Sequence, residues 1–206
     1  DLPERYGSWK TVYSRFRLGA DQGIFEKVFL ELSSDNPDLE NVSLDSTSVK
    51  VHQKVRVLKK SRCDVKVQVI GVRRGGKTTK IHTIVDALGN SLRFMLTRGH
   101  VHDSKVATDM LGAINLNGVN VIADKAYGTS DLREYIESNS GSYTIPPKSN
   151  ILQKWDCDYY LYREWHLIEN FFNQLKNYWR IATRYEKLAH TFLEYIYLTS
   201  IVILLK

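Results

Sequence analysis

The sequence predicts an α/β fold in which one sheet is flanked by helices. Residues 41–52 and 119–124 are short runs rich in β-branched and other apolar residues, as in strands. Residues 78–97 form two alternating apolar and polar runs around Leu88-Gly89-Asn90, which is the pattern of a β-hairpin. Apolar residues at helical spacing precede, separate and follow these stretches. Strands that alternate with helices along the chain indicate an α/β domain.

The length and charge of the chain limit its organisation. A chain of 206 residues can form one domain with a substantial core, and we expect a helical segment over residues 1–40 and a larger domain over residues 41–206. The net charge of +6 favours a polyanionic partner, and the two cysteines lack the spacing of a zinc site. Residues 192–205 are apolar but interrupted and shorter than the roughly 20 residues that span a bilayer. We therefore expect a buried C-terminal helix, no membrane partner and a cytoplasmic protein.

Two short helices are expected before the first strand. One begins at Ser8, the other runs from Ile24 to Leu32, and residues 19–23 separate them. Basic side chains on the first helix could contact DNA phosphates, because helix-turn-helix modules have this shape. The other interpretation is that the two helices pack on a core and the basic side chains face solvent.

Two aspartates occupy notable positions in the expected strands. Asp45 lies within the strand over residues 41–52, although aspartate is disfavoured in strands. It is therefore either at a bend or placed for chemistry. Asp124 ends the buried strand over residues 119–124, and functional sites of α/β sheets collect at such carboxyl ends.

A long amphipathic helix is predicted from Tyr159 to Trp179. Its apolar stripe follows spacings of three and four residues and consists of Leu161, Trp165, Ile168, Phe172, Leu175 and Trp179. Glu169 lies at the edge of this stripe, and Lys176 follows seven residues later on nearly the same face. Glu169 either forms a salt bridge at the edge of the core or joins a metal-binding cluster of carboxylates.

Asp45, Asp124 and Glu169 are together candidates for such a cluster. Three carboxylates that converge repel one another unless divalent cations lie between them, and oxygen ligands suit Mg²⁺ or Mn²⁺. Two such ions can activate a water or a 3′-hydroxyl and stabilise the leaving oxygen in phosphoryl transfer.

A second motif points to a different function. Residues 71–78, GVRRGGKT, satisfy the G-x-x-x-x-G-K-[ST] pattern of a nucleotide-binding loop and would make the chain a nucleotide hydrolase. That site needs a helix after the loop, so that the amides at its N-terminus face the phosphates. The alternation that begins at Thr78 predicts a strand there, and the glycines are more consistent with a tight turn.

A third motif is the H-x-H pair His100 and His102, followed by Asp103. Such a pair can bind one metal ion from a strand end. Alternatively, His102 or Asp103 forms a hydrogen bond with a neighbouring element.

Several blocks of the chain, in order, resemble the DDE transposases of bacterial insertion sequences. They are WKTVYSRF near the start, LDSTSVKVHQ around Asp45, RRGGKTTKIHTIVDALGNSLRFMLTRG, HDS at residues 102–104, ADKAYG around Asp124, IPPKSN, HLIENFFNQLK and RIATRYEKLA. The resemblance covers nearly the whole chain. It is to the insertion-sequence-five-like group within the insertion-sequence-four superfamily.

The resemblance implies a fold, a site and a reaction. The fold would be a ribonuclease H-like mixed five-stranded sheet flanked by helices, with Asp45, Asp124 and Glu169 as catalytic metal ligands. The reaction would be metal-dependent strand cleavage at the ends of the element, followed by transfer of the 3′-hydroxyl into target DNA. The expected DNA contacts are Lys176, Tyr162, Arg74, Lys77 and Lys125. The partners would be the terminal repeats and the target DNA, bound by a homodimer associated with the bacterial nucleoid.

The chain departs from the family pattern in three places. The helix pattern Tyr, two residues, Arg, three residues, Glu, six residues, Lys is matched except that Trp165 occupies the arginine position. Trp cannot form the two-pronged contact that a guanidinium makes with phosphate. Ala126 and Gly128 stand where the family more often has Gly and Asp, and the N-terminal DNA-binding region is expected to be truncated. The alternative function is therefore a catalytically impaired remnant that only binds DNA.

Overall fold

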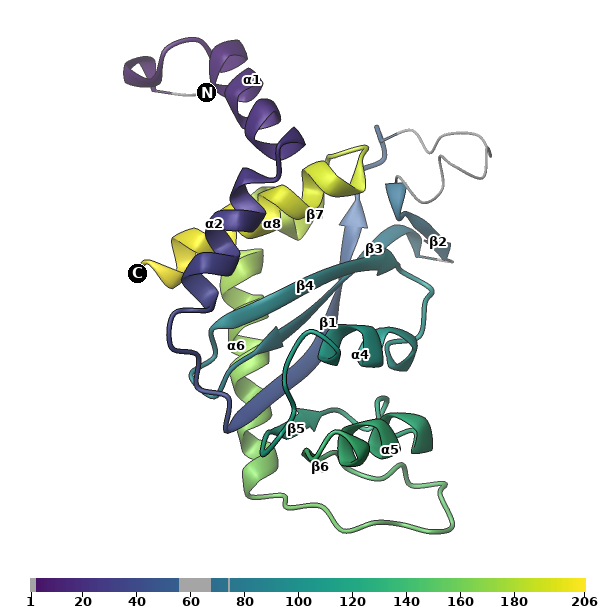
Figure 1. Cartoon of the computed structure of the whole chain (residues 1–206). Helices are drawn as coiled ribbons and strands as arrows, with labels where there is room; N and C mark the ends of the chain where they lie inside the picture. The colour runs from purple at the N-terminus through teal and green to yellow at the C-terminus, as the bar shows by residue number, and fades with distance from the viewer. Residues whose placement is uncertain (1–2, 56–67, 74) are drawn as a thin grey trace.

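The computed structural model describes residues 3–55, 68–73 and 75–206 and shows one mixed sheet with helices on both faces (Figure 1). The strands are β1 (Asn41–Val51), β2 (Gly71–Arg73), β3 (Gly76–Val85), β4 (Ser91–Arg98), β5 (Asn120–Ala123), β6 (Ser142–Thr144) and β7 (Thr183–Arg184). The α-helices are α1 (Trp9–Asp21), α2 (Ile24–Ser33), α4 (Ser104–Leu111), α5 (Ser130–Ser138), α6 (His166–Lys176), α7 (Trp179–Ala182) and α8 (Ala189–Leu204), and the 3₁₀ helices are η1 (Glu4–Tyr6) and η2 (Leu161–Trp165). The α/β prediction is confirmed.

The sheet has seven strands among the described residues, and the predicted number of five is wrong. β1 lies between β3, to which it is antiparallel, and β5, to which it is parallel. β4 pairs with β3 and β6 pairs with β5, so these five strands form the main body of the sheet. The two additional strands, β2 and β7, have only three and two residues. Segments this short carry no alternation from which a strand could have been predicted.

The two faces of the sheet bury separate hydrophobic cores. On one face, Val42 and Leu44 of β1 pack with residues of α4 and α5. On the other face, Val49 of β1 packs with residues of α2, α6 and α8. The change of face follows from the period of two in a strand, which sends even-numbered and odd-numbered side chains to opposite sides.

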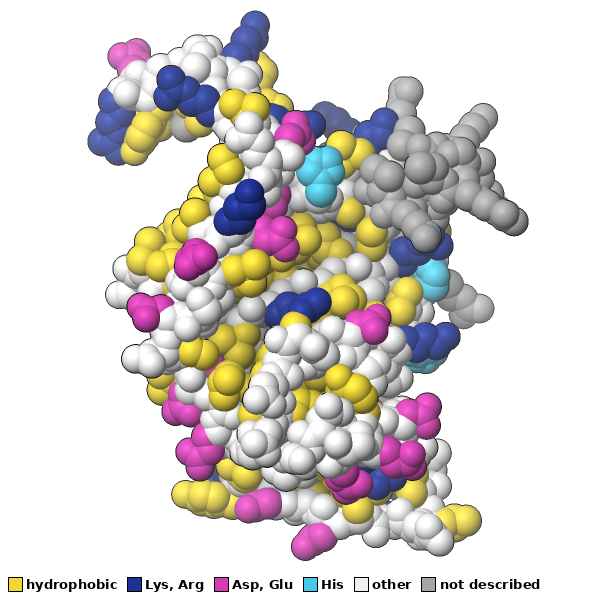
Figure 2. Space-filling model, viewed as in Figure 1, with side chains coloured by type: hydrophobic (Ala, Val, Ile, Leu, Met, Phe, Trp, Pro, Cys, Tyr) yellow, Lys and Arg dark blue, Asp and Glu magenta, His cyan; other side chains and the backbone are white. Residues whose placement is uncertain are grey.

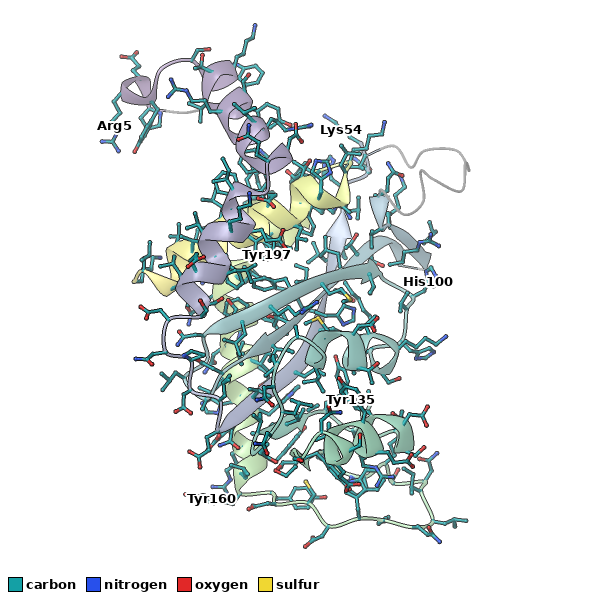
Figure 3. All side chains as sticks on the ribbon, viewed as in Figure 1. Arg5, Lys54, His100, Tyr135, Tyr160 and Tyr197 are labelled. Atoms are coloured by element: carbon teal, nitrogen blue, oxygen red, sulfur yellow. The ribbon has the colours of Figure 1, made fainter. Side chains whose placement is uncertain are left out.

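The N-terminal helices α1 and α2 form an arm. The second helix, α2, belongs to the core that also contains residues of α6 and α8. Phe29 of α2 is fully buried, and its ring centroid lies 5.3 Å from that of Phe94 and 5.1 Å from that of Tyr197. The Tyr197 hydroxyl, on α8, donates a hydrogen bond to Glu26 of α2 at 3.0 Å (Figure 3). α1 extends away from the body of the molecule (Figure 1), and hydrophobic side chains are visible along the arm (Figure 2). Packing on a core is therefore confirmed for α2, whereas Trp9 of α1 is 62% exposed.

The predicted continuous helix from Tyr159 to Trp179 is wrong, because the segment folds as η2, α6 and α7. Asp158 Oδ1 accepts hydrogen bonds from the backbone N–H groups of Tyr160 and Leu161, and a 3₁₀ turn rather than an α-helix follows. Tyr178 has an extended backbone, with φ −85° and ψ 113°, so the helix does not continue through it. The stripe is buried within α6, but Trp179 lies beyond this break and is 72% exposed.

The β3–β4 hairpin is confirmed, and its turn is held by one carboxylate. Asp86 Oδ1 accepts hydrogen bonds from the N–H groups of Leu88 at 3.0 Å and Asn90 at 2.8 Å. Gly89 has φ +84°, which glycine adopts more readily than other residues.

The nucleotide-binding loop is ruled out by the same hairpin. Residues 76–85 form β3, so no helix follows the Gly71–Thr78 motif. The phosphate site that a helix N-terminus would provide is therefore missing from this motif.

The C-terminal apolar run forms α8, as predicted, and α8 contributes Phe192 and Ile196 to the core. Across the parts of the chain that the structure describes, no helix is long and apolar enough to cross a membrane.

Candidate active site

Asp45 and Asp124 come together because of the pairing between two parallel strands. The β1–β5 ladder ends at the pair Leu44 and Ala123, so each aspartate is the next residue on its strand. Neighbouring parallel strands hold such positions side by side. Both side chains are half-buried at this end of the ladder.

Glu169 and Lys176 approach this point from α6. Ile168 and Leu175 are fully buried and fix α6 against the sheet. Glu169 is exposed in the first turn of the helix, and Lys176 is half-buried in its last turn. The Asp45 charge acts on Lys176, whose pKa is nevertheless lowered because burial disfavours the ammonium ion. One helix therefore brings an acid and a base to the end of the β1–β5 ladder.

The four acids around this point repel one another. Burial, and after it the charges of Asp124, Asp103 and Glu169 in that order, together raise the pKa of Asp45 to about 7, against the lowering effect of a backbone hydrogen bond from Ser46. The structure thus brings the three predicted acids within electrostatic reach of one another. Asp103, which the sequence did not predict as part of this group, belongs to it as well.

The turn after Asp124 is shaped by the aspartate itself. Asp124 Oδ1 accepts a hydrogen bond from the Ala126 N–H at 2.8 Å, and the Asp124 carbonyl accepts one from the Tyr127 N–H at 3.0 Å. Tyr127 is 1% exposed, and burial, followed by the charges of Asp45, Asp103 and Asp124, raises the pKa of its phenol. The hydroxyl therefore stays protonated beneath the acids.

The donor set fits a hard divalent cation by its chemistry. Asp45, Asp124 and Glu169 are carboxylates, and the charges of Asp124 and Glu169 repel that of Asp45. The Asp45 charge in turn acts to raise the pKa of Lys176, against the larger effect of burial. Within residues 3–55, 68–73 and 75–206, however, no three His, Cys, Asp or Glu side chains stand in an arrangement that could already hold an ion. This result includes the H-x-H pair at His100 and His102, which is thus not a metal site in this arrangement.

Asp103 forms hydrogen bonds with neighbouring elements, as the alternative interpretation of the H-x-H motif predicted. Its Oδ1 accepts a hydrogen bond from Ser46 Oγ at 2.7 Å and from Lys80 Nζ at 2.7 Å. Lys80 Nζ also donates to the Val101 carbonyl at 3.0 Å. These bonds lower the pKa of Asp103 against the opposing effect of burial, so the carboxylate is charged.

A cavity of about 670 Å³ opens next to Asp124. Its wall includes Asp103 together with three lysines, Lys125, Lys148 and Lys154. None of these lysines forms an ion pair with a described residue, so their charges are not paired directly with the carboxylates that line the same cavity. The sequence identified Lys125 as a candidate but not Lys148 and Lys154, because lysines in an irregular segment carry no periodic signal.

The other predicted DNA contacts lie in different places. Tyr162 is near the acids: its ring stacks on that of Trp165, with centroids 6.1 Å apart, and burial and then Asp124 and Asp45 raise the pKa of Tyr162 to about 12. Lys77 Nζ donates a hydrogen bond to the Val55 carbonyl at 2.8 Å, so it is engaged at the start of β3. Arg74 lies outside the described residues, as does the basic stretch over residues 56–67.

Trp165 occupies the position at which the family pattern has arginine. It is half-buried against the core that α6 faces, and its indole N–H is buried without a hydrogen-bond partner among the described residues. The side chain thus contributes to packing and offers no charge to the site.

The structure explains why residue 128 is a glycine, which the sequence did not reveal. A Cβ atom at this position would lie 3.0 Å from Cζ2 of Trp155 and 3.5 Å from a methyl carbon of Ile145. The Trp155 indole N–H donates to the Ile145 carbonyl at 2.7 Å, and the Arg133 guanidinium lies 3.9 Å from the ring. The space where the family more often has an aspartate is therefore filled by Trp155.

Known proteins resemble the chain in sequence and, weakly, in structure. The family model for the transposase DDE domain matches residues 37–205. A Brucella ovis protein assigned as a transposase for insertion sequence element IS6501 is 39% identical over 132 residues, which are 63% of this chain and 99% of that protein.

Among solved structures, the piggyBac transposase synaptic complex with hairpin DNA has a TM-score of 0.38 and 12% identity, over 57% of this chain and 24% of that one. The Mos1 transposase paired-end complex with the left transposon end has a TM-score of 0.35 and 11% identity, over 94% and 59%. The chain thus spans less than two thirds of either solved chain, and scores this low support no comparison of sites. The match over residues 37–205 and the 39% identity to the Brucella ovis protein show that the chain belongs to the DDE transposase family.

Proposed function

We propose that this chain is a DNA transposase of a bacterial insertion sequence, in the insertion-sequence-five-like group. It would cleave a strand at the ends of the element and join the freed 3′-hydroxyl to target DNA. The observation that carries the proposal is the adjacency of Asp45 and Asp124 at the end of the β1–β5 ladder, with Glu169 supplied by α6. Asp124 and Glu169 lie far from Asp45 in the sequence, yet their charges act on its carboxylate.

Asp45, Asp124 and Glu169 would hold Mg²⁺ or Mn²⁺, as a pair of ions. Such ions, when bound, activate the attacking water or 3′-hydroxyl and stabilise the leaving oxygen. The pKa of Asp45, which burial and then the neighbouring carboxylates raise, supports this role, because a divalent cation would relieve the part of the shift that comes from repulsion. The three side chains would have to turn toward the ion, since they are not yet arranged around one.

The DNA would lie across the cavity beside Asp124. Lys125, Lys148 and Lys154 line that cavity without forming ion pairs among the described residues, and such lysines attract a phosphate backbone. Lys176 and Tyr162 would contact the DNA on the α6 side of the acids, where the Asp45 charge reaches both. Lys77 would extend the contact at the start of β3, and Arg74, which lies outside the described residues, is proposed as a further contact from the sequence alone.

The wider assignment follows from the same proposal. The five main strands would be a ribonuclease H-like sheet, and residues 41–206 would form the catalytic domain after a DNA-binding segment over residues 1–40. Because transposition joins two ends, we infer a homodimer on DNA that works in the nucleoid of the bacterial cytoplasm.

A cleavage assay with terminal DNA of the element tests the reaction. Asp124→Asn should lower the rate of Mg²⁺- or Mn²⁺-dependent cleavage by at least about 10²-fold, the scale of losing one group that stabilises developing charge. Asparagine keeps an oxygen for the Ala126 N–H, so the turn should persist. Asp109→Asn, on the exposed face of α4, is the matched control. Cleavage that survives Asp124→Asn, or that needs no metal, contradicts the mechanism.

The second candidate function is DNA binding without cleavage, and Trp165 favours it because a guanidinium is missing from the family position. This candidate predicts binding that weakens with salt, that weakens further when Lys125, Lys148 and Lys154 become glutamine, and that leads to no cleavage with any metal. Trp165→Arg would then restore cleavage. If the unchanged chain cleaves terminal DNA, this candidate is rejected.

A further inference from the structure

The Asp103 carboxylate is fixed more firmly than any of the three proposed metal ligands. Its Oδ1 accepts from Lys80 Nζ and Ser46 Oγ, each at 2.7 Å, and Lys80 Nζ is held in turn by the Val101 carbonyl at 3.0 Å. The side chains of Lys80 and Asp103 are only 10% and 22% exposed, so this ion pair is shielded from solvent. Three parts of the fold meet in it: β1, β3 and the loop before α4.

Ser46 occupies a critical place on β1. It is the residue after Asp45, and the pairing of β1 with β5 has already ended at Leu44. On that side β1 finds its next backbone partner only at Lys50, which pairs with β7. Among the described residues, residues 45–49 are therefore paired only with β3. The hydrogen bond from Ser46 to Asp103 fixes the strand on the side where pairing with β5 has ended.

The charge of Asp103 also acts on groups at the candidate site. It acts on Asp45 more strongly than Glu169 does, and it acts on the buried Tyr127 hydroxyl. Lys80 compensates this charge directly, which allows a fourth carboxylate to remain ionised in the group.

We propose that Asp103 is a positioning residue for Asp45: by accepting the Ser46 hydrogen bond, it holds the adjoining part of β1 so that the Asp45 carboxylate is oriented for a divalent cation. The inference rests on the proposed function, in which Asp45 holds that cation. Hydrogen-bond partners that orient metal ligands typically change metal affinity by 10- to 100-fold when they are removed.

The test is the affinity of the full chain for Mn²⁺, measured from the electron paramagnetic resonance signal of the free ion, without DNA or turnover. Ser46→Ala removes the hydrogen bond and leaves the Lys80–Asp103 ion pair intact; we expect an affinity lower by about 10-fold. Ser46→Thr keeps the hydroxyl and should retain the affinity of the unchanged chain. Ser48→Ala is the matched control, because Ser48 is exposed on the same strand and its hydroxyl has no hydrogen-bond partner among the described residues.

A double-mutant cycle separates the hydrogen bond from the charge. If Asp103 acts through Ser46, then Ser46→Ala should add nothing to the effect of Asp103→Asn. Thermal unfolding of each variant, compared with Asp109→Asn, shows whether a lower affinity merely reflects lower stability. Ser46→Ala with unchanged Mn²⁺ affinity overturns the inference. If Asp45→Asn also leaves the affinity unchanged, the proposed function fails instead, so the two failures are distinguishable.

Discussion

His82 illustrates how burial outweighs a neighbouring charge at a single residue. The ring is fully buried on β3; Nε2 is 2.7 Å from Thr97 Oγ1, and Nδ1 is 3.8 Å from Asp103 Oδ1 without a hydrogen bond. Burial lowers the pKa of His82 to about 4, although Asp103 opposes this shift; Lys80 adds to it. His82 is therefore neutral in the folded chain at physiological pH.

The contribution of His82 to the stability of the fold should fall as the pH drops below about 6.5, whereas the contribution of Asp45, whose pKa is raised to about 7, changes in the opposite direction. The unfolded chain protonates His82 near its ordinary pKa, whereas the folded chain does so only near pH 4, so the unfolded state gains protons first. The stabilisation present above pH 6.5, up to about 3 kcal/mol, is lost between pH 6.5 and pH 4. Urea unfolding at pH 7 and pH 5 measures it. His82→Gln should reduce the difference, while His102→Gln, at an exposed position, should not; an equal difference in all three chains contradicts the assignment.

At the scale of elements, the turn after β5 and the loop after β6 pack closely against each other. Trp155 covers Gly128, is tied to the Ile145 carbonyl and lies under the Arg133 guanidinium. The same turn carries Asp124, and the same loop carries the cavity lysines Lys148 and Lys154. The position of the lysines relative to the acids therefore depends on the contact between Gly128 and Trp155.

Gly128→Ala should destabilise the chain by about 1–3 kcal/mol, because the added Cβ would overlap Trp155. Trp155→Phe, which removes part of the ring, should reduce the penalty of Gly128→Ala when the two are combined. Urea unfolding of the single and double variants gives the coupling energy. Gly75→Ala is the control, since a Cβ at Gly75 would meet no atom of the described residues within 4 Å. Equal penalties for Gly128→Ala with and without Trp155 would show that the two elements are independent.

At the scale of the whole molecule, the N-terminal arm is continuous with the core. Phe29 is fully buried in the cluster that also contains Phe94 of β4 and Tyr197 of α8. Acidic side chains gather around α5 at the opposite end of the molecule (Figure 2), while the entry into α6 lies near Tyr160 (Figure 3). The residues assigned to a separate N-terminal segment thus share a core with residues beyond position 41.

Phe29→Ala should lower the free energy of unfolding of the whole chain by about 3–5 kcal/mol, as expected for a large aromatic side chain lost from a core. Tryptophan fluorescence and circular dichroism should report one coincident transition in urea. Leu30→Ala, on the same helix but 47% exposed, should have a much smaller effect. Two separate transitions would mean that the arm unfolds independently of the sheet.

The sequence by itself determined the local features and the family. The β-branched runs specified β1 and β5, Asp86 and Gly89 specified the hairpin turn, and the ordered blocks predicted the transposase family that the family match confirms. The strands and the turn depend on residues close together in the chain, so composition and spacing are sufficient to predict them, whereas the family followed from the resemblance of blocks along nearly the whole chain.

Only the tertiary structure decided which groups surround the acids. Ser46 and Asp103 are 57 residues apart in the chain, and no periodic pattern links them. Two of the cavity lysines, Lys148 and Lys154, lie in an irregular loop, and the break at Tyr178 and the cover over Gly128 depend on packing between distant segments. Such contacts form only after the sheet has brought β1, β3, β5 and their loops together, because local propensity carries no information about partners distant in sequence.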